Sequence, residues 1–311
     1  AKKIGRDREE RCLSEVKQRH IYAAIREAHE EKGYPIELAC ESLHVARSAY
    51  HRWASGRLGR RTAENERLAD TIEKIHEESP DKGYRRLNDD LRHDHGIHVN
   101  DKRVLRICRT RDIRSTIKYN NHGCTRQAKN PQYLAENLLN RRFYAAKPNE
   151  KWLTDVTEFK WYEGTEVHKL YLSAILDLCD RRIVSYVLSE RNDNPLVFKT
   201  LDKAIQANPD AHPLFHSDRG FQYTNRTFHH KLTQAGMTQS MSRVAHCIDN
   251  GPMEGFWGIL KRERYYGRRF TSKRELIQTI ENYIHYYNTR RVQRNLGVLT
   301  PMEKHTLCLA A

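Results

Sequence analysis

The spacing of hydrophobic residues changes character near residue 149. Before that point, hydrophobic residues recur at intervals of three and four among many charged side chains. This period is typical of amphipathic helices. Beyond it, three runs rich in apolar and β-branched residues cover 151–160, 166–176 and 182–189, with turn residues between them. The pattern predicts a helical region followed by a region built on antiparallel strands.

The helical region divides into several elements. Residues 1–33 predict one helix, and residues 34–60 predict two short helices around a turn. That layout is typical of a helix-turn-helix, although an ordinary helical hairpin has the same pattern. Residues 61–114 predict an amphipathic helix and then a second domain of this kind, whose last helix Asn100 can cap.

A basic linker is predicted to follow over residues 115–148, with one helix near 131–139. Residues 101–150 contain 12 Lys and Arg against 4 Asp and Glu. Aromatic residues interrupt these cations. They could stack on unpaired bases or anchor the linker on a domain, and the pattern favours neither.

The last part of the chain alternates helices with short strands. Residues 149–266 predict a mixed α/β domain with five strands, and residues 267–311 a C-terminal helix and tail. The elements expected after the first three strands are a helix at 194–206, a strand at 214–216, a helix at 225–235, a strand at 238–241, a helix that ends near 265 and a helix at 272–288.

The net charge of +15 indicates a polyanionic partner such as a nucleic acid, although a solvated basic surface would give the same count. The seven cysteines contain no CxxC pair, which argues against a disulfide framework or a structural zinc site. We expect a cytoplasmic protein with no membrane span, because no apolar run reaches the ~18 residues that a span needs.

Three acidic residues are the candidates for catalysis. Asp155 lies within a strand-like run, Asp218 follows a short apolar stretch, and Glu254 follows a helix-start signal at residues 249–252. Pro252 suits the first helical turn, which Asn250 or Gly251 could cap. Carboxylates that converge from two strands and a helix could hold two Mg²⁺ ions for an in-line phosphoryl transfer.

The other acids of this region receive a structural interpretation. Glu158 lies three residues along the strand from Asp155 and points to the other face. Asp177, Asp180 and Asp249 lie in or beside loops. His216 could orient a carboxylate, touch DNA or be a satisfied structural histidine.

Several cations are candidate DNA contacts. Lys261 follows Glu254 by seven residues, almost two helical turns, so both project from one face of the helix. The remaining candidates are Arg262, Arg264, Arg243, Arg47, Arg52, Lys102, Arg103 and Arg106.

From about residue 34 to the C-terminus, the chain resembles the bacterial insertion-sequence transposases of the IS three family, near the branch numbered one-fifty. These belong to the DDE transposase and retroviral integrase superfamily. The residues that carry the resemblance are 152–159 (WLTDVTEF), 216–218 (HSD), Gly220, 222–223 (QY), 240–243 (SMSR), 249–250 (DN), Glu254, Lys261, 286–291 (YYNTRR) and 299–301 (LTP). The chain departs from the family at 244–246 (VAH for KGN) and at Gly251, Gly255 and Trp257, where Ala, Ser and Phe are common.

The resemblance implies a ribonuclease H-like catalytic fold with Asp155, Asp218 and Glu254 as metal ligands and catalytic residues. It implies two Mg²⁺ ions, with Mn²⁺ expected to substitute. The partners would be DNA at transposon ends and target, and a homo-oligomer, expected to be a dimer, on paired ends. The family also implies an upstream reading-frame product or fusion, and residues 1–3 (AKK) fit such a junction. We expect association with the bacterial nucleoid.

The function expected is binding of terminal inverted repeats, followed by metal-dependent strand cleavage and strand transfer. One alternative is a ribonuclease H-type nuclease that cuts without joining. Another is a DNA-binding regulator without catalysis.

Overall fold

The computed structural model describes residue 18 and residues 20–56, 60–117, 132–243 and 247–310. Much of the predicted first helix, the middle of the predicted linker and the tripeptide at 244–246 lie outside this part of the chain. The chain forms two compact units. Their boundary along the sequence falls between Glu73 and Lys74, within helix α4 (Arg60–Glu78).

The first unit is a small helical cluster. Residues 20–32 are helical, and α2 (Ile36–Ser42) and α3 (Arg47–Ala54) follow around a turn at His44. Its core contains Tyr22, Ile25, Cys40 and Tyr50. The two predicted short helices are therefore present, and their binding to DNA stays a prediction.

The second unit begins with a helical hairpin. Helix α5 (Tyr84–His95) ends at Gly96, whose left-handed φ of 63° turns the chain toward α6 (Asp101–Thr110). The Asn100 side chain accepts a hydrogen bond from the Lys102 amide at 2.8 Å, so the predicted cap is confirmed. Leu87 and Leu91 of α5 are fully buried, as is Val104 of α6.

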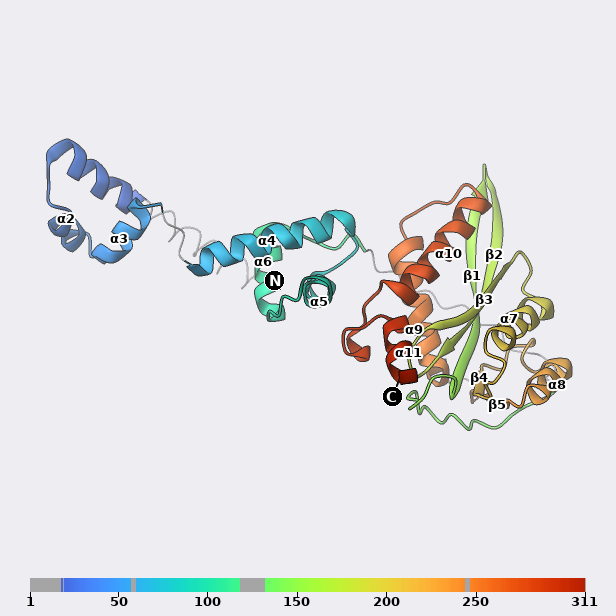
Figure 1. Ribbon diagram of the computed structural model, residues 1–311. Coiled ribbons are helices and arrows are strands. Elements are labelled where there is room, and N and C mark those ends of the chain that lie inside the picture. The colour runs from blue at the N-terminus through green and yellow to red at the C-terminus, as the bar shows by residue number, and fades with distance from the viewer. Residues whose placement is uncertain (1–17, 19, 57–59, 118–131, 244–246, 311) are drawn as a thin grey trace. The chain divides into compact units, whose positions relative to one another are not determined.

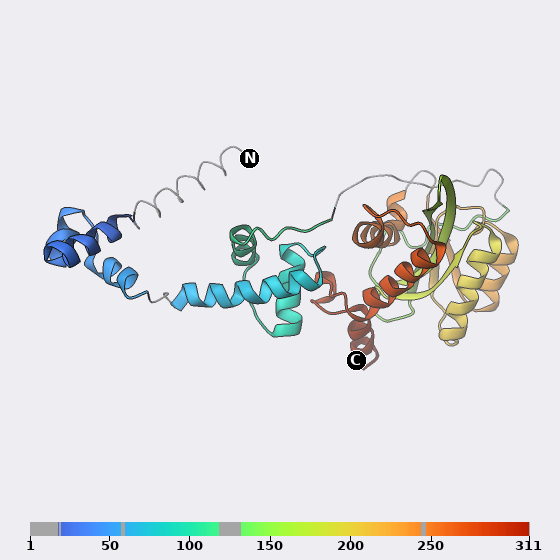
Figure 2. The same cartoon turned by 90° about the horizontal axis from the view of Figure 1, so that it is seen from above.

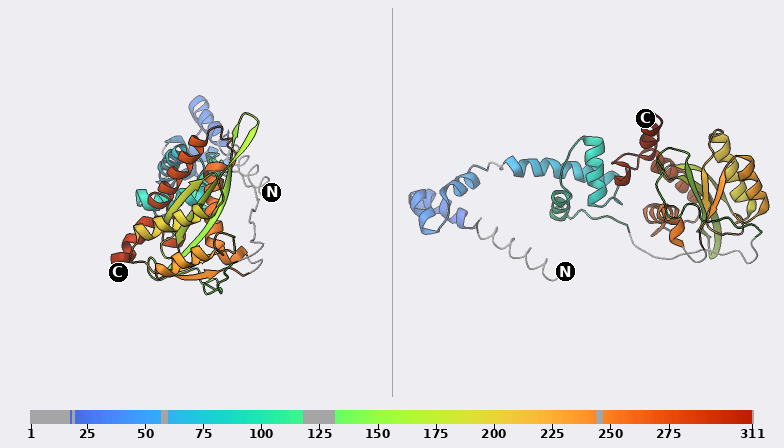
Figure 3. Two further views of the ribbon diagram at one scale, coloured as in Figure 1. Left: turned by 90° about the vertical axis from the view of Figure 1, so that its right-hand side faces the viewer. Right: turned by 90° about the horizontal axis from the view of Figure 1, so that it is seen from below.

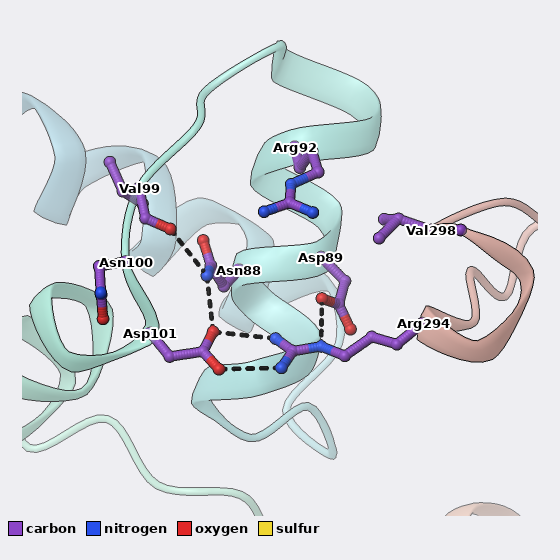
Figure 4. A pocket seen from close by; sticks show the side chains of 9 residues that line it. Asn88, Asp89, Arg92, Val99, Asn100, Asp101, Arg294 and Val298 are labelled. Carbon is purple, nitrogen blue, oxygen red and sulfur yellow. Dashed lines mark hydrogen bonds and ion pairs between the residues drawn. The ribbon is translucent and has the colours of Figure 1, made fainter.

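Arg294, the first residue of a short 3-10 helix (Arg294–Leu296), bonds this hairpin to the C-terminal part of the unit. Its guanidinium donates to Asp89 at 2.6 Å and to both carboxylate oxygens of Asp101 at 2.8 and 2.9 Å (Figure 4). These hydrogen bonds hold the pKa of Asp101 at about 2. They border a cavity of about 420 Å³ between α5, the start of α6 and the loop at Val298.

The centre of the second unit is a five-stranded sheet in the order β3-β2-β1-β4-β5. β1 pairs antiparallel with β2 and parallel with β4, β2 pairs antiparallel with β3, and β4 pairs parallel with β5. The strands are β1 (Lys151–Glu163), β2 (Glu166–Asp177), β3 (Ile183–Ser189), β4 (Leu214–Ser217) and β5 (Thr238–Met241). The mixed five-stranded sheet with flanking helices confirms the predicted ribonuclease H-like α/β fold.

Helices cover both faces of the sheet (Figures 1 and 2). Helices α7 (Asn194–Ala207) and α8 (Arg226–Gln234) pack on the face that carries Trp152 and Phe215. Helices α9 (Gly251–Leu260) and α10 (Lys273–Thr289) pack on the face that carries Leu153 and Phe159. The long β1–β2 hairpin is the light green loop in the left view of Figure 3.

One prediction in this region was wrong. Residues 132–139 are not helical, although the linker was expected to form a helix there. Their backbone bonds to the core instead: the Met241 amide donates to Glu136 O, and the Leu138 and Leu139 amides donate to Ser240 Oγ. Because these donors are satisfied by tertiary contacts, the segment runs as an extended strap beside β5.

Helix α11 (Pro301–Ala310) was missed within the predicted C-terminal tail. Thr300 and Glu303 form a reciprocal capping box. The Thr300 amide donates to the Glu303 carboxylate at 2.7 Å, and the Glu303 amide donates to Thr300 Oγ1 at 3.2 Å. This Thr-x-x-Glu spacing was readable in the sequence. Across the described residues, every helix is too short or too polar to cross a membrane.

Candidate active site

Strand register brings Asp155 and Asp218 together. In the parallel β1–β4 pair, Leu153 lies opposite His216. Continuing this register by two residues in the direction of each strand places Asp155 beside Asp218. Asp218 lies just after the end of β4, and its Oδ1 accepts a hydrogen bond from the Gly220 amide at 2.8 Å. A Cβ atom at Gly220 would come within 3.0 Å of that oxygen, so the turn favours glycine.

Glu254 reaches the same region from the first turn of α9. The helix is held on the sheet by Met253, Phe256 and Leu260, which are at most 1% exposed and which each contribute roughly 1.5–3 kcal/mol by burial. Asn250 occupies the N-cap position, but its side chain makes no capping hydrogen bond. The Asn250 side chain donates instead to Thr154 O at 3.1 Å, next to Asp155.

A second bond joins α9 to β1. Trp257, one turn beyond Glu254, donates from Nε1 to Asp155 Oδ2 at 3.0 Å. The other Asp155 oxygen accepts from the Val156 amide at 2.8 Å. Trp257 stands where Phe is common in the family, and the sequence pattern assigned no role to it. Its spacing of three from Glu254 and its N–H donor were the available signals.

The three carboxyl groups act on one another electrostatically. Burial and the charge of Asp218 raise the pKa of Asp155 to about 8, with a smaller contribution from Glu254. Burial also raises the pKa of Asp218. The pKa of Glu254 is raised by partial desolvation and by the charge of Asp218, although this side chain is exposed. The site thus holds negative charge that its surroundings do not fully compensate.

The donor set fits a hard divalent cation. Mg²⁺ is commonly held by one or two carboxylates, with waters and substrate phosphate completing its shell. The Asp155–Asp218 pair supplies two carboxylates in a partly exposed position. Within the described ranges, no three His, Cys, Asp or Glu side chains stand close enough together to ligate one ion. Glu254 is the exposed member of the set, whereas Asp155 and Asp218 are half-buried.

Asp249 anchors the segment that leads into α9. Its carboxylate is inaccessible to solvent and accepts bonds from Asn137 Nδ2 at 2.9 Å and Arg141 Nε at 2.8 Å. Arg243 donates to the same carboxylate from its backbone amide, Nε and Nη2, at 3.0–3.1 Å. The pKa of Asp249 is lowered, and the hydrogen bonds from Arg243 are the main cause. Asp249 thereby connects the strap and the residues after β5 to the segment that immediately precedes α9.

His216 is occupied within the fold. Its Nδ1 bonds to Ser240 Oγ at 2.8 Å and its Nε2 to Ser242 Oγ at 3.2 Å. Burial lowers the pKa of His216 to about 4, so the ring is neutral at physiological pH. These contacts favour the structural interpretation over a direct role.

The acids given a structural interpretation have other partners. Glu158 accepts from Lys169 at 2.9 Å. Asp177 accepts from the Asn149 and Cys179 amides and from Trp152 Nε1. Asp180 accepts from His305 at 2.6 Å and from the Arg182 amide at 2.9 Å.

The predicted DNA-contact residues occupy varied environments. Lys261 lies 5.2 Å above the Phe159 ring, on the sheet face that carries Asp155, where α9 widens into a π-helix (Lys261–Tyr265). Arg264 lies 3.5 Å from Asp81, and Arg47 pairs with Glu37 at 2.6 Å. Arg52, Lys102 and Arg106 are exposed, whereas Arg103 and Arg262 are half-buried. Their contacts with DNA, and that of Arg243, stay predictions.

Comparison with known proteins places recognised domains on this structure. A model for an HTH-like domain matches residues 63–120, and models for an integrase core domain match residues 145–247 and 254–307. All three acidic candidates lie within the integrase core matches. The strap at 132–139 lies outside all three models.

Several curated proteins are similar over most of their length. The putative transposase InsK for insertion sequence element IS150 of Escherichia coli (strain K12) is 38% identical over 273 residues, which cover 87% of this chain and 93% of that protein. The transposase InsF for insertion sequence IS3A of the same organism is 30% identical, covering 86% and 93%. An uncharacterized transposase-like protein of Haemophilus influenzae is 40% identical, covering 68% and 96%.

Proposed function

Because the chain belongs to the insertion-sequence transposases of the IS three family, we propose that it binds the terminal inverted repeats of its element and carries out metal-dependent strand cleavage and strand transfer. The proposed catalytic residues and metal ligands are Asp155, Asp218 and Glu254. The proposed cofactor is Mg²⁺ as two ions, for which Mn²⁺ substitutes. The proposed assembly is an oligomer on paired DNA ends.

One observation carries this proposal. The β1–β4 register aligns Asp155 with Asp218, and α9 brings Glu254 within electrostatic range of both. Such a set of carboxylates is stabilised when a divalent cation binds, and the scissile phosphate can complete the shell. The bound ions would activate the attacking oxygen and stabilise the leaving one.

The residues of the chain have distinct tasks in this chemistry. Asp155 and Asp218 would hold the ions, and Glu254 would close the site from α9. Lys261, on the same sheet face, would bind a neighbouring phosphate of the DNA. In the first step water attacks a phosphodiester and a 3′-hydroxyl leaves. In the second step that hydroxyl attacks a phosphodiester of another strand, so one P–O bond forms as one breaks.

A strand-transfer assay tests the proposal. The substrate is duplex DNA that carries the sequences flanking the coding region of this chain, with a supercoiled plasmid as target. Wild-type protein should release a 3′-hydroxyl end and join it to the target. Asp155→Asn should reduce both steps by about a thousandfold or more, since losing a metal ligand costs several kcal/mol of transition-state stabilisation.

The matched control is Glu158→Gln, on the same strand as Asp155 and paired with Lys169. It should keep both activities. Cleavage without joined product would support the ribonuclease H-type alternative. Unchanged DNA binding and Mg²⁺-dependent cleavage in Asp155→Asn would refute the assignment of the site.

A further inference from the structure

Trp257 contacts a proposed metal ligand directly. Its side chain is 6% exposed and belongs to the core between α9 and the sheet, yet its indole N–H is directed at Asp155 Oδ2. Since the Val156 amide donates to Oδ1, each oxygen of this carboxylate has one donor. The carboxylate orientation is thus determined by protein contacts before any ion binds.

The bond also joins two elements that carry different members of the acidic set. Glu254 and Trp257 are three residues apart on α9, so their side chains lie on neighbouring parts of one helix face. At the start of the helix, Asn250 donates to Thr154 O, one residue before Asp155. Glu254 therefore lies between two hydrogen bonds that hold α9 against β1.

We propose that Trp257 is a positioning residue for the metal site. Its indole N–H fixes the orientation of the Asp155 carboxylate and holds the Glu254 turn of α9 at the spacing that ion binding requires. This inference rests on the proposed function, because that function identifies Asp155 and Glu254 as ligands. Groups that orient metal ligands in this way commonly change metal affinity by 10–100-fold when removed.

The fold contains a matched control for this bond. Trp152, three residues before Asp155 on β1, donates from Nε1 to Asp177 Oδ2 at 3.2 Å. Both tryptophans are buried, and both donate to a carboxyl group whose pKa burial raises. Trp152 lies on the other face of the sheet and touches no proposed ligand. Replacing each by Phe removes the same kind of hydrogen bond with a similar loss of volume.

The test compares Mn²⁺ binding to the full chain without DNA, measured by calorimetry, in the wild type, Trp257→Phe, Trp152→Phe and Asp155→Asn. Trp257→Phe should bind Mn²⁺ about tenfold more weakly than the wild type. Trp152→Phe should keep the wild-type affinity even if its melting temperature falls. In cleavage assays, Trp257→Phe should need about tenfold more Mg²⁺ for half-maximal rate and should recover most of the rate at saturating Mg²⁺.

Equal Mn²⁺ affinity in the wild type and Trp257→Phe would overturn the inference and leave the proposed function intact. Equal weakening in both tryptophan variants would also overturn it, because general loosening would then be the cause. Wild-type binding that Asp155→Asn does not reduce would overturn the proposed function together with this inference.

A second measurement covers the case in which Trp257→Phe does not fold. The indole N–H resonance that moves in Asp155→Asn identifies Trp257 in the wild type. That resonance should shift when Mg²⁺ is added, while the resonance that moves in Asp177→Asn should not. A Trp257 resonance that does not respond to Mg²⁺ would overturn the inference.

Discussion

The sheet carries two acidic pairs. The Asp177–Asp180 pair is buried and is satisfied by the protein, whereas the Asp155–Asp218 pair is partly exposed. Asp177 receives three N–H donors, and its neighbour Asp180 pairs with His305 and Arg182. Burial and the charge of Asp180 raise the pKa of Asp177 to about 6.

The pair formed by Asp155 and Asp218 has fewer donors. Its described hydrogen bonds come from the Val156 and Gly220 amides and from Trp257. The pKa of Asp155 rises further, to about 8, through burial and the charge of Asp218. Buried carboxylates that are fully paired stabilise a fold, whereas under-compensated ones indicate a site that needs a cation from outside. The difference in donors thus separates a structural acidic pair from a functional one.

The largest effect is expected from breaking the satisfied pair. Asp180→Asn should lower the free energy of unfolding by about 3 kcal/mol, because it leaves Arg182 without its counter-charge and His305 without its carboxylate partner. In a unit of this size the melting temperature should fall by roughly 6–12 °C. Thermal unfolding measures it, with the exposed Asp210→Asn as control. A drop no larger than the control's would contradict the interpretation of this pair.

A change in pH is expected to have a smaller effect on the free energy of unfolding. A carboxyl group whose folded pKa is raised stabilises the fold while it is protonated, and this contribution is lost as pH rises through the folded pKa. In metal-free buffer, stability should therefore fall between pH 6.5 and 8.5 by up to about 2 kcal/mol as Asp155 ionises beside Asp218. The pKa of Asp177, raised to about 6 by burial and the charge of Asp180, lies below this window, so this group should contribute little there.

The control for the pH effect is Asp218→Asn, which removes the repelling charge and keeps an acceptor for the Gly220 amide. Because burial still raises the pKa of Asp155 in this variant, thermal unfolding should depend on pH less steeply than in the wild type between pH 6.5 and 8.5. An unchanged slope would mean that the two acids do not titrate together.

The smallest expected effect is stabilisation by the ion. At pH 8.5 and at tenfold its dissociation constant, Mg²⁺ should stabilise the wild type by about 1.4 kcal/mol. The stabilisation should be weaker at pH 6.5, where a proton occupies the Asp155–Asp218 pair. Thermal shift with added MgCl₂ measures it. Asp155→Asn should show little shift, and a full shift in that variant would place the ion elsewhere.

The elements with strong local signals were predictable. The first three strands appear at 151–163, 166–177 and 183–189, because alternation and the turn at Gly164 encode a hairpin locally. The capping box at Thr300 was an equally local signal for α11 that the sequence analysis overlooked. By contrast, the helix expected near 131–139 had no clean hydrophobic period behind it, and hydrogen bonds with Ser240 and Met241 hold residues 132–139 as an extended strap instead.

The sequence predicted which acidic residues form the candidate site, but it did not predict how they are arranged or which side chains contact them. The motifs around Asp155, Asp218 and Glu254 marked these acids because each lies in a short, recognisable segment. The local signals at Trp257 and Asp249 did not reveal the partners of these residues. Their importance comes from partners far along the chain, at Asp155 and at Arg141.

The sequence by itself determined the family, the order of the five strands and the three candidate acids, since each depends on short segments that are recognisable in the chain. The tertiary structure alone decided that β4 pairs parallel to β1, that the strap lies beside β5 and that an indole reaches Asp155. The reason is physical. Local patterns encode backbone preferences, whereas the charge left uncompensated in a site depends on which distant donors the packed core brings to it.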